Sequence, residues 1–173
     1  MRIRSAVAVM LLLTALAACA SRPPPDSPGA AVAALYAAHQ PWKNRSVDLA
    51  DPAALRRHFD PGLAELLARA AAQDNRVLDF DPVLDAQDFG DWPDGLPLTL
   101  TDLSAPGRVL WRASFPLFPG RTRAEDRRVD YELVRTGDGW RIHDMLHHHG
   151  DRVSSLRTVL AAARNEAAPP DRK

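Results

Sequence analysis

Residues 127–146, RRVDYELVRTGDGWRIHDML, decide the fold because they contain two strand patterns joined by a tight turn. Apolar and charged side chains alternate over residues 127–135, which is the two-residue period of a strand with one buried face. Two glycines and an aspartate within residues 136–139 predict a hairpin turn. We therefore expect the chain to return as an antiparallel strand over residues 140–146.

Two segments upstream of this hairpin also have strand patterns. Residues 109–117 alternate in the same way, and residues 98–103 form a shorter candidate strand. Downstream, Ser154 is expected to cap a helix that continues to about residue 164. The second half of the chain is therefore predicted to be an antiparallel meander followed by one helix.

The first half of the chain has helical patterns. Residues 30–40 predict a helix, because the i, i+3, i+4 and i+7 positions of one face hold Val32, Leu35, Tyr36 and His39. Asp-Pro pairs at 51–52 and 60–61 each put an N-cap aspartate before a proline at the first helical position. They predict helices that end near residues 58 and 73. Helices first and a meander later predict an α+β fold.

Residues 1–18 have the composition of a bacterial secretory signal peptide. Arg2 and Arg4 give a positive start, and an apolar run broken only by Thr14 follows over residues 6–18. The run is shorter than a segment that crosses a bilayer comfortably, so we expect a signal that is removed.

Leu16, Ala17 and Ala18 stand directly before Cys19, and this order resembles the lipobox of bacterial lipoproteins. The resemblance implies that the mature chain begins at Cys19, whose thiol carries a lipid anchor with acyl chains such as palmitate. Cys19 is the only cysteine, which excludes an intramolecular disulfide. Because Ala20 follows it, the sorting rule of Gram-negative lipoproteins implies the periplasmic face of the outer membrane. The alternative is an ordinary cleaved signal peptide.

The remaining chain is expected to have three parts. Residues 19–28 form a lipidated, proline-rich tether, residues 29–165 a single domain, and residues 166–173 a disordered tail. Basic and acidic residues number 22 each, and no basic cluster is interleaved with aromatic residues. We therefore expect no nucleic-acid partner.

Three separated motifs have a family resemblance. They are LYAAH at residues 35–39, LDFDPVLDAQDF at 78–89 and WRIHD at 140–144. Together they resemble the bacterial envelope family known as domain of unknown function 3828, within the nuclear transport factor 2-like superfamily. The resemblance implies N-terminal helices packed on a curved antiparallel sheet, the cystatin-like cone, and it implies no particular reaction or cofactor.

The middle motif lies in an acidic segment, residues 74–102, which contains eight aspartates and one basic residue. Closely spaced carboxylates suit calcium, although their spacing differs from that of an EF-hand. We prefer loop architecture, with one helical turn at residues 82–85, aspartates that bind backbone amides, and a glutamine that binds backbone groups. The motif residues of interest are Asp79, Asp81, Pro82, Gln87 and Asp88.

Asp144 shares the strand face of Ile142 by simple alternation, so one interpretation is an acid that points inward. In enzymes of the cone-shaped superfamily, a cavity acid can act as general base with a tyrosine as donor. Tyr36, Tyr131 and His39 are then further cavity candidates. We prefer the alternative in which Asp144 binds backbone groups or the last helix at the sheet end, because burying a lone acid is costly.

Four histidines lie close together, at residues 143 and 147–149. With Asp144 and Asp151 they could bind zinc or copper. Three consecutive histidines cannot all point to one side of a regular strand. We therefore expect a solvated loop between the last strand and the last helix, and no bound metal or other cofactor.

Motifs of common enzyme classes are missing from the sequence: it contains no G-x-S-x-G, no H-E-x-x-H, no P-loop and no dinucleotide-binding glycine pattern. We expect a non-enzymatic, lipid-anchored binding or accessory module with an envelope protein as partner. Two alternatives stay open. One is a small-ligand binder or cryptic enzyme that uses the cone cavity, and the other is an immunity or inhibitor protein against a periplasmic hydrolase.

Overall fold

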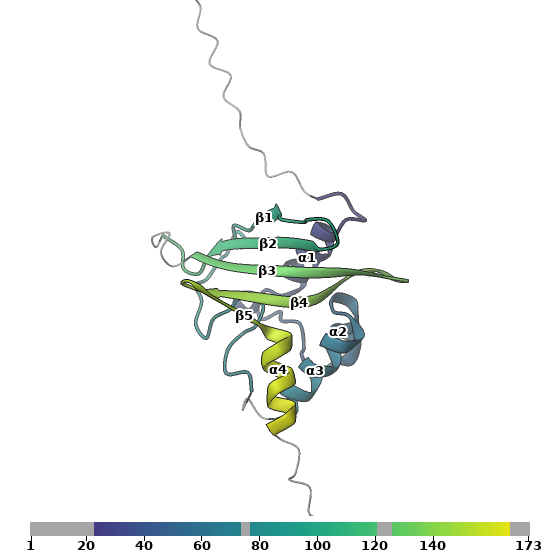
Figure 1. The fold of residues 1–173 in the computed structure, drawn as a ribbon. Helices are drawn as coiled ribbons and strands as arrows, with labels where there is room; N and C mark the ends of the chain where they lie inside the picture. Colours follow the sequence, from purple (N-terminus) through teal and green to yellow (C-terminus); the bar gives the residue numbers. More distant parts are fainter. Residues whose placement is uncertain (1–22, 74–76, 121–125, 167–173) are drawn as a thin grey trace, which may run out of the picture.

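The computed structural model describes residues 23–73, 77–120 and 126–166 (Figure 1). The signal peptide, the lipobox, Cys19 and the last seven residues of the tail lie outside these ranges. The helices and strands, in chain order, are α1 (Pro28–Ala38), a 3-10 turn (Pro41–Lys43), α2 (Pro52–His58), α3 (Pro61–Ala71), β1 (Thr99–Asp102), β2 (Val109–Pro116), β3 (Asp126–Thr136), β4 (Gly139–His149), β5 (Arg152–Ser155) and α4 (Leu156–Glu166).

These elements confirm the predicted α+β class. The five strands form one open antiparallel sheet in sequence order, from β1 at one edge to β5 at the other. The decisive alternation is confirmed, because Val129, Tyr131 and Leu133 of β3 are at most 3% exposed. A two-residue turn, Gly137 and Asp138, joins β3 to β4 as predicted.

A bulge in β4 changes which of its side chains face the core. Tyr131 pairs with Met145 and Leu133 pairs with Ile142, so β4 has one residue more than β3 between these pairs. Ile142 and Met145 are both fully buried in the core. Asp144 therefore lies on the opposite face, and its predicted place beside Ile142 is wrong because the extra residue reverses the alternation.

Helix α1 packs on the core face of the sheet. The Tyr36 ring meets Phe115 of β2 and Tyr131 of β3 edge-on, with centroids 5.6 and 6.0 Å apart. Near its start, Gly29 lies against the Trp111 ring, which a Cβ at this position would approach to 2.4 Å. Helices α2, α3 and α4 lie together on the β4 side of the sheet (Figure 1).

Both Asp-Pro pairs start helices as predicted. Asp51 accepts a hydrogen bond from the Ala53 amide at 2.8 Å, and Asp60 accepts one from the Leu63 amide at 2.7 Å. Helix α3 ends at Ala71, two residues before the predicted end.

The predictions for the C-terminal segment need two corrections. Residues 147–149 are not a solvated loop but the end of β4, because the short strand β5 pairs with them. Ser155, rather than Ser154, caps α4, since its hydroxyl accepts from the Thr158 amide at 3.0 Å.

Candidate functional site

The motif loop, residues 79–88, is folded back on itself. Backbone hydrogen bonds join Asp81 and Ala86 in both directions, so residues 82–85 form a turn closed by a bridge rather than the helical turn expected from the sequence. The Asp81 carboxylate accepts from the amides of Val83 and Leu84 at 2.9 and 3.1 Å, as expected for an aspartate that stabilises a turn. Gln87 differs from its prediction, because it donates to the Asp79 carboxylate at 3.2 Å instead of binding backbone groups.

His39 ties the motif loop to the end of α1. Its Nδ1 accepts from the Val47 amide at 3.2 Å, and its Nε2 lies 2.6 Å from the Asp81 carboxylate. Because Nδ1 is an acceptor, the neutral ring carries its proton on Nε2 and donates it to Asp81. Both nitrogens of His39 are therefore occupied within the protein.

Tyr36 and Tyr131 bind the same loop from the core. The Tyr36 hydroxyl donates to the Val83 carbonyl at 3.1 Å, and the Tyr131 hydroxyl donates to the Tyr36 oxygen at 2.9 Å. The two side chains are 5% and 0% exposed. Burial raises the pKa of both phenols well above the ordinary value, so they act as neutral donors inside the core.

Asp144 does not join these tyrosines. Its carboxylate accepts from the Ser155 hydroxyl at 2.6 Å and from the amides of Met145 and Arg157 at 2.8 and 2.9 Å. It thereby fixes the start of α4 to β4. These contacts agree with the preferred interpretation from the sequence, in which Asp144 binds backbone groups and the final helix.

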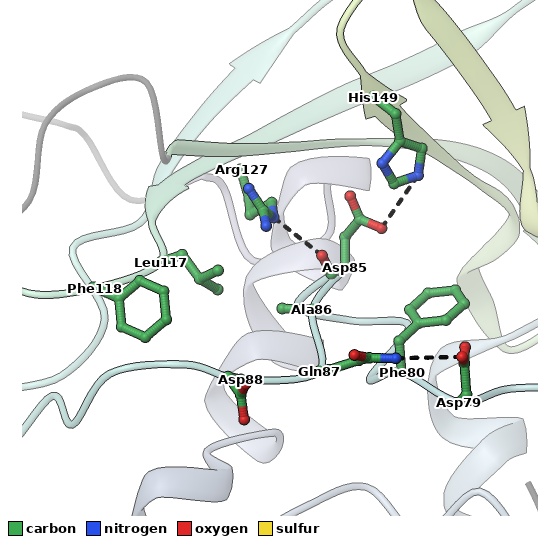
Figure 2. A pocket seen from close by; sticks show the side chains of 10 residues that line it. All are labelled: Asp79, Phe80, Asp85, Ala86, Gln87, Asp88, Leu117, Phe118, Arg127 and His149. Carbon is green, nitrogen blue, oxygen red and sulfur yellow. Dashed lines mark hydrogen bonds and ion pairs between the residues drawn. The ribbon is translucent and has the colours of Figure 1, made fainter.

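A pocket of about 490 Å³ lies between the motif loop and the neighbouring ends of β3 and β4 (Figure 2). Three residues singled out from the sequence line it, namely Asp79, Gln87 and Asp88. Asp85 of the acidic segment and His149 of the histidine cluster line it as well, together with Arg127, which was not a candidate from the sequence. Phe80, Leu117 and Phe118 supply its apolar surface.

Asp85 is the most buried charged side chain of this pocket. Its side chain is 2% exposed, and its backbone has a φ of 51°, a left-handed conformation that aspartate and asparagine tolerate better than most residues. Arg127 donates from Nε to the Asp85 carbonyl at 3.1 Å. The Oδ2 atom is buried and has no hydrogen-bond partner within the described part of the chain.

Two histidines approach the other carboxylate oxygen of Asp85. The Nδ1 atom of His147 lies 3.8 Å from Oδ1, and Nε2 of His149 lies 3.6 Å from it. Burial lowers the pKa of His147, and its Nε2 lies 2.9 Å from the Pro82 carbonyl. The neutral ring therefore donates its Nε2 proton to the Pro82 carbonyl, and its unprotonated Nδ1 faces Asp85.

The remaining clustered histidines bind other aspartates. His143 lies 2.5 Å from Asp60, and His148 lies 2.9 Å from Asp130. Burial opposes ionisation of both aspartates, but these contacts and an arginine beside each outweigh it and lower both pKa values. Within the three described ranges, no group of three or more His, Cys, Asp or Glu side chains is arranged to hold a metal ion.

Comparisons of the chain with protein-family models, with curated proteins and with solved structures found no match. In the described part of the chain, no helix has both the length and the apolar character that crossing a bilayer requires. The fold and the site define an α+β protein in which a tightly bonded acidic loop forms one side of a polar pocket.

Proposed function

We propose that this protein is a non-enzymatic binding module of the bacterial envelope, anchored through lipid on Cys19 to the periplasmic face of the outer membrane. The observation that carries the binding role is that the four cavity candidates are all hydrogen-bonded within the protein. Asp144, Tyr36, Tyr131 and His39 all bind other groups of the protein. They serve as positioning groups, which favours binding over acid–base catalysis.

We also propose membership of the family known as domain of unknown function 3828, with its cone-shaped fold. Two of the three motifs that carry the resemblance bind each other. Tyr36 and His39 of the first motif contact Val83 and Asp81 of the second. This contact supports the resemblance, because motifs that bind each other are more characteristic of a shared fold than motifs that lie apart.

The surface that we assign to the protein partner is the acidic face, defined as Asp88, Asp91 and Asp94. All three aspartates are exposed, and none has an ion-pair partner among the residues that the structure describes. Trp92, which directly follows Asp91 in the sequence, is half-buried and offers an aromatic contact. Such a face favours a partner with a basic surface, because complementary charge accelerates encounter and selects the partner.

The anchor is tested by palmitate labelling and membrane fractionation of the full chain. We expect the wild-type chain to be labelled and to sediment with outer membranes, and Cys19→Ser to lose both properties. Normal labelling of Cys19→Ser would refute the anchor.

The binding role is tested by affinity purification of the lipidated chain from membranes. We expect one reproducible envelope protein, which is lost when Asp88, Asp91 and Asp94 are all changed to asparagine. The matched control is Asp138→Asn, which removes one exposed carboxylate from the β3–β4 turn. Recovery of no reproducible partner, or of the same partner from the triple variant, would count against the proposed function.

A further inference from the structure

We propose that the pocket beside the motif loop binds a small organic cation, in which an ammonium or guanidinium group is carried on an apolar skeleton. Asp85 is the counter-ion of this ligand. The proposal concerns a ligand site of the domain itself, and it depends neither on the lipid anchor nor on a protein partner.

The Asp85 carboxylate has one buried oxygen without a partner in the described part of the chain. Its side chain is 2% exposed, yet Oδ2 has no hydrogen-bond partner among the described residues. Burying a carboxylate is costly unless a cation or several donors compensate for the lost water. Because Asp85 lines the pocket, this buried oxygen indicates a site that is completed by a group which the described residues do not supply.

The neighbouring cationic groups that the structure describes do not satisfy the Asp85 carboxylate. Arg127 uses its Nε on the Asp85 carbonyl, and it forms no ion pair with the carboxylate. His147 is fully buried and presents an unprotonated Nδ1. His149 stays 3.6 Å away, and its side chain is 56% exposed. Figure 2 shows the Asp85 carboxylate between Arg127 and His149.

The remaining walls of the pocket are acidic and apolar. Asp79 and Asp88 are exposed at the rim. Together with Asp85 they give the described lining three carboxylates, against one guanidinium, that of Arg127. Phe80 and Leu117 add an apolar surface, and an aromatic ring face also attracts cations. A volume of about 490 Å³ accommodates a small organic ligand. Because His149 is half exposed, it can turn outward and admit the cationic group to Asp85.

The test is calorimetric titration of the full chain in a non-ionic detergent with three probes of similar skeleton. The probes are the 2-phenylethylammonium cation, neutral 2-phenylethanol and the phenylacetate anion. We expect the cation to bind at least about tenfold more tightly than the alcohol, and the anion to bind least. Equal binding of all three, preference for the anion, or no binding of the cation would overturn the proposal.

Variants locate the site. Asp85→Asn retains a residue that tolerates the left-handed backbone, and we expect it to bind the cation at least about tenfold more weakly. Asp138→Asn, in the β3–β4 turn, is the control that should leave the affinity unchanged. If Asp85→Asn does not fold, as judged by circular dichroism, the exposed pair Asp79→Asn and Asp88→Asn decides, and unchanged affinity in that double variant would contradict the proposal. Because this assay uses purified chain, its result is independent of palmitate labelling and of partner recovery.

Discussion

Replacing Asp60 would remove a side chain that joins three elements. It caps α3 by accepting from the Leu63 amide at 2.7 Å, and Arg157 of α4 donates from Nη2 to its two oxygens at 2.7 and 2.8 Å. His143 of β4 lies 2.5 Å from Oδ2. The side chains of Asp60 and Arg157 are 10% and 26% exposed, so water screens their ion pair only partly.

The expected cost follows from these contacts. Loss of a helix cap lowers the free energy of unfolding by about 1 kcal/mol. Loss of hydrogen bonds to a charged partner lowers the free energy of unfolding by a further amount of about 1.5–3 kcal/mol. We therefore expect Asp60→Ala to lose roughly 3 kcal/mol, and Asp60→Asn, which keeps the cap, roughly 2 kcal/mol.

Asp51 provides a matched control because it caps α2 with the same Asp-Pro arrangement. It accepts from the Ala53 amide and has no ion-pair partner in the described part of the chain. Asp51→Ala should therefore lose about 1 kcal/mol, whereas Asp51→Asn should be nearly neutral.

The pH dependence of the Asp60 effect has a definite sign. Burial alone would raise its pKa, but the Leu63 amide, His143 and Arg157 outweigh burial and lower the pKa below the ordinary 3.8. A carboxyl with a lower pKa in the folded state stabilises the fold above its unfolded pKa, and this contribution is lost as the pH falls through the folded pKa. The difference between wild type and Asp60→Asn should thus be complete at neutral pH and shrink below about pH 4.

Urea unfolding, followed by tryptophan fluorescence and circular dichroism, measures these differences at neutral and at acidic pH. Wild-type stability in Asp60→Asn, or an equal loss in Asp60→Asn and Asp51→Asn, would show that the Asp60 contacts do not stabilise the fold as described.

Two further predictions concern the core. The chain contains only two tyrosines, Tyr36 and Tyr131, and both have raised pKa values; the folded chain should therefore show no tyrosinate absorbance at a pH of about 10, whereas the urea-unfolded chain should titrate there. Tyrosinate formation by the folded chain near that pH would contradict their burial. Gly29→Ala should lower the free energy of unfolding by about 1–3 kcal/mol, because the new Cβ would press on the Trp111 ring. Gly137→Ala, whose new Cβ would meet no heavy atom within 4 Å, should be tolerated, and equal stability of the two variants would rule out the close packing at Gly29.

The sequence predicts the local elements of this fold well. The β3–β4 hairpin, the meander order and the two Asp-Pro helix starts follow from alternation, turn residues and capping chemistry. The bulge in β4 could not be predicted from residues 142–145, which read Ile-His-Asp-Met. Simple alternation gives each face of this segment one apolar and one polar residue, so the pattern does not show which face is buried. Strand β5 was missed since its four residues, RVSS, carry no alternation of their own.

The candidate site was predicted in part, through its loop. Asp79, Gln87 and Asp88 belong to a motif that is visible in the sequence, and they line the pocket. Asp85 is one of the eight aspartates of the acidic segment, and only the fold singles it out, because it places Arg127, 42 residues away, and His149 beside it. Contacts of such sequence separation leave no local pattern, so they cannot be read from spacing alone.

The central claim is that the acidic face binds an envelope partner while lipid on Cys19 holds the chain at the membrane. Photo-crosslinking in living cells tests it most directly, with a photoreactive residue in place of Asp91 on the acidic face or of Thr101 on the edge strand β1. Both positions are exposed. We predict one crosslinked envelope protein from position 91 and none from position 101. The absence of a crosslink from position 91, or the same crosslink from both positions, would contradict the claim.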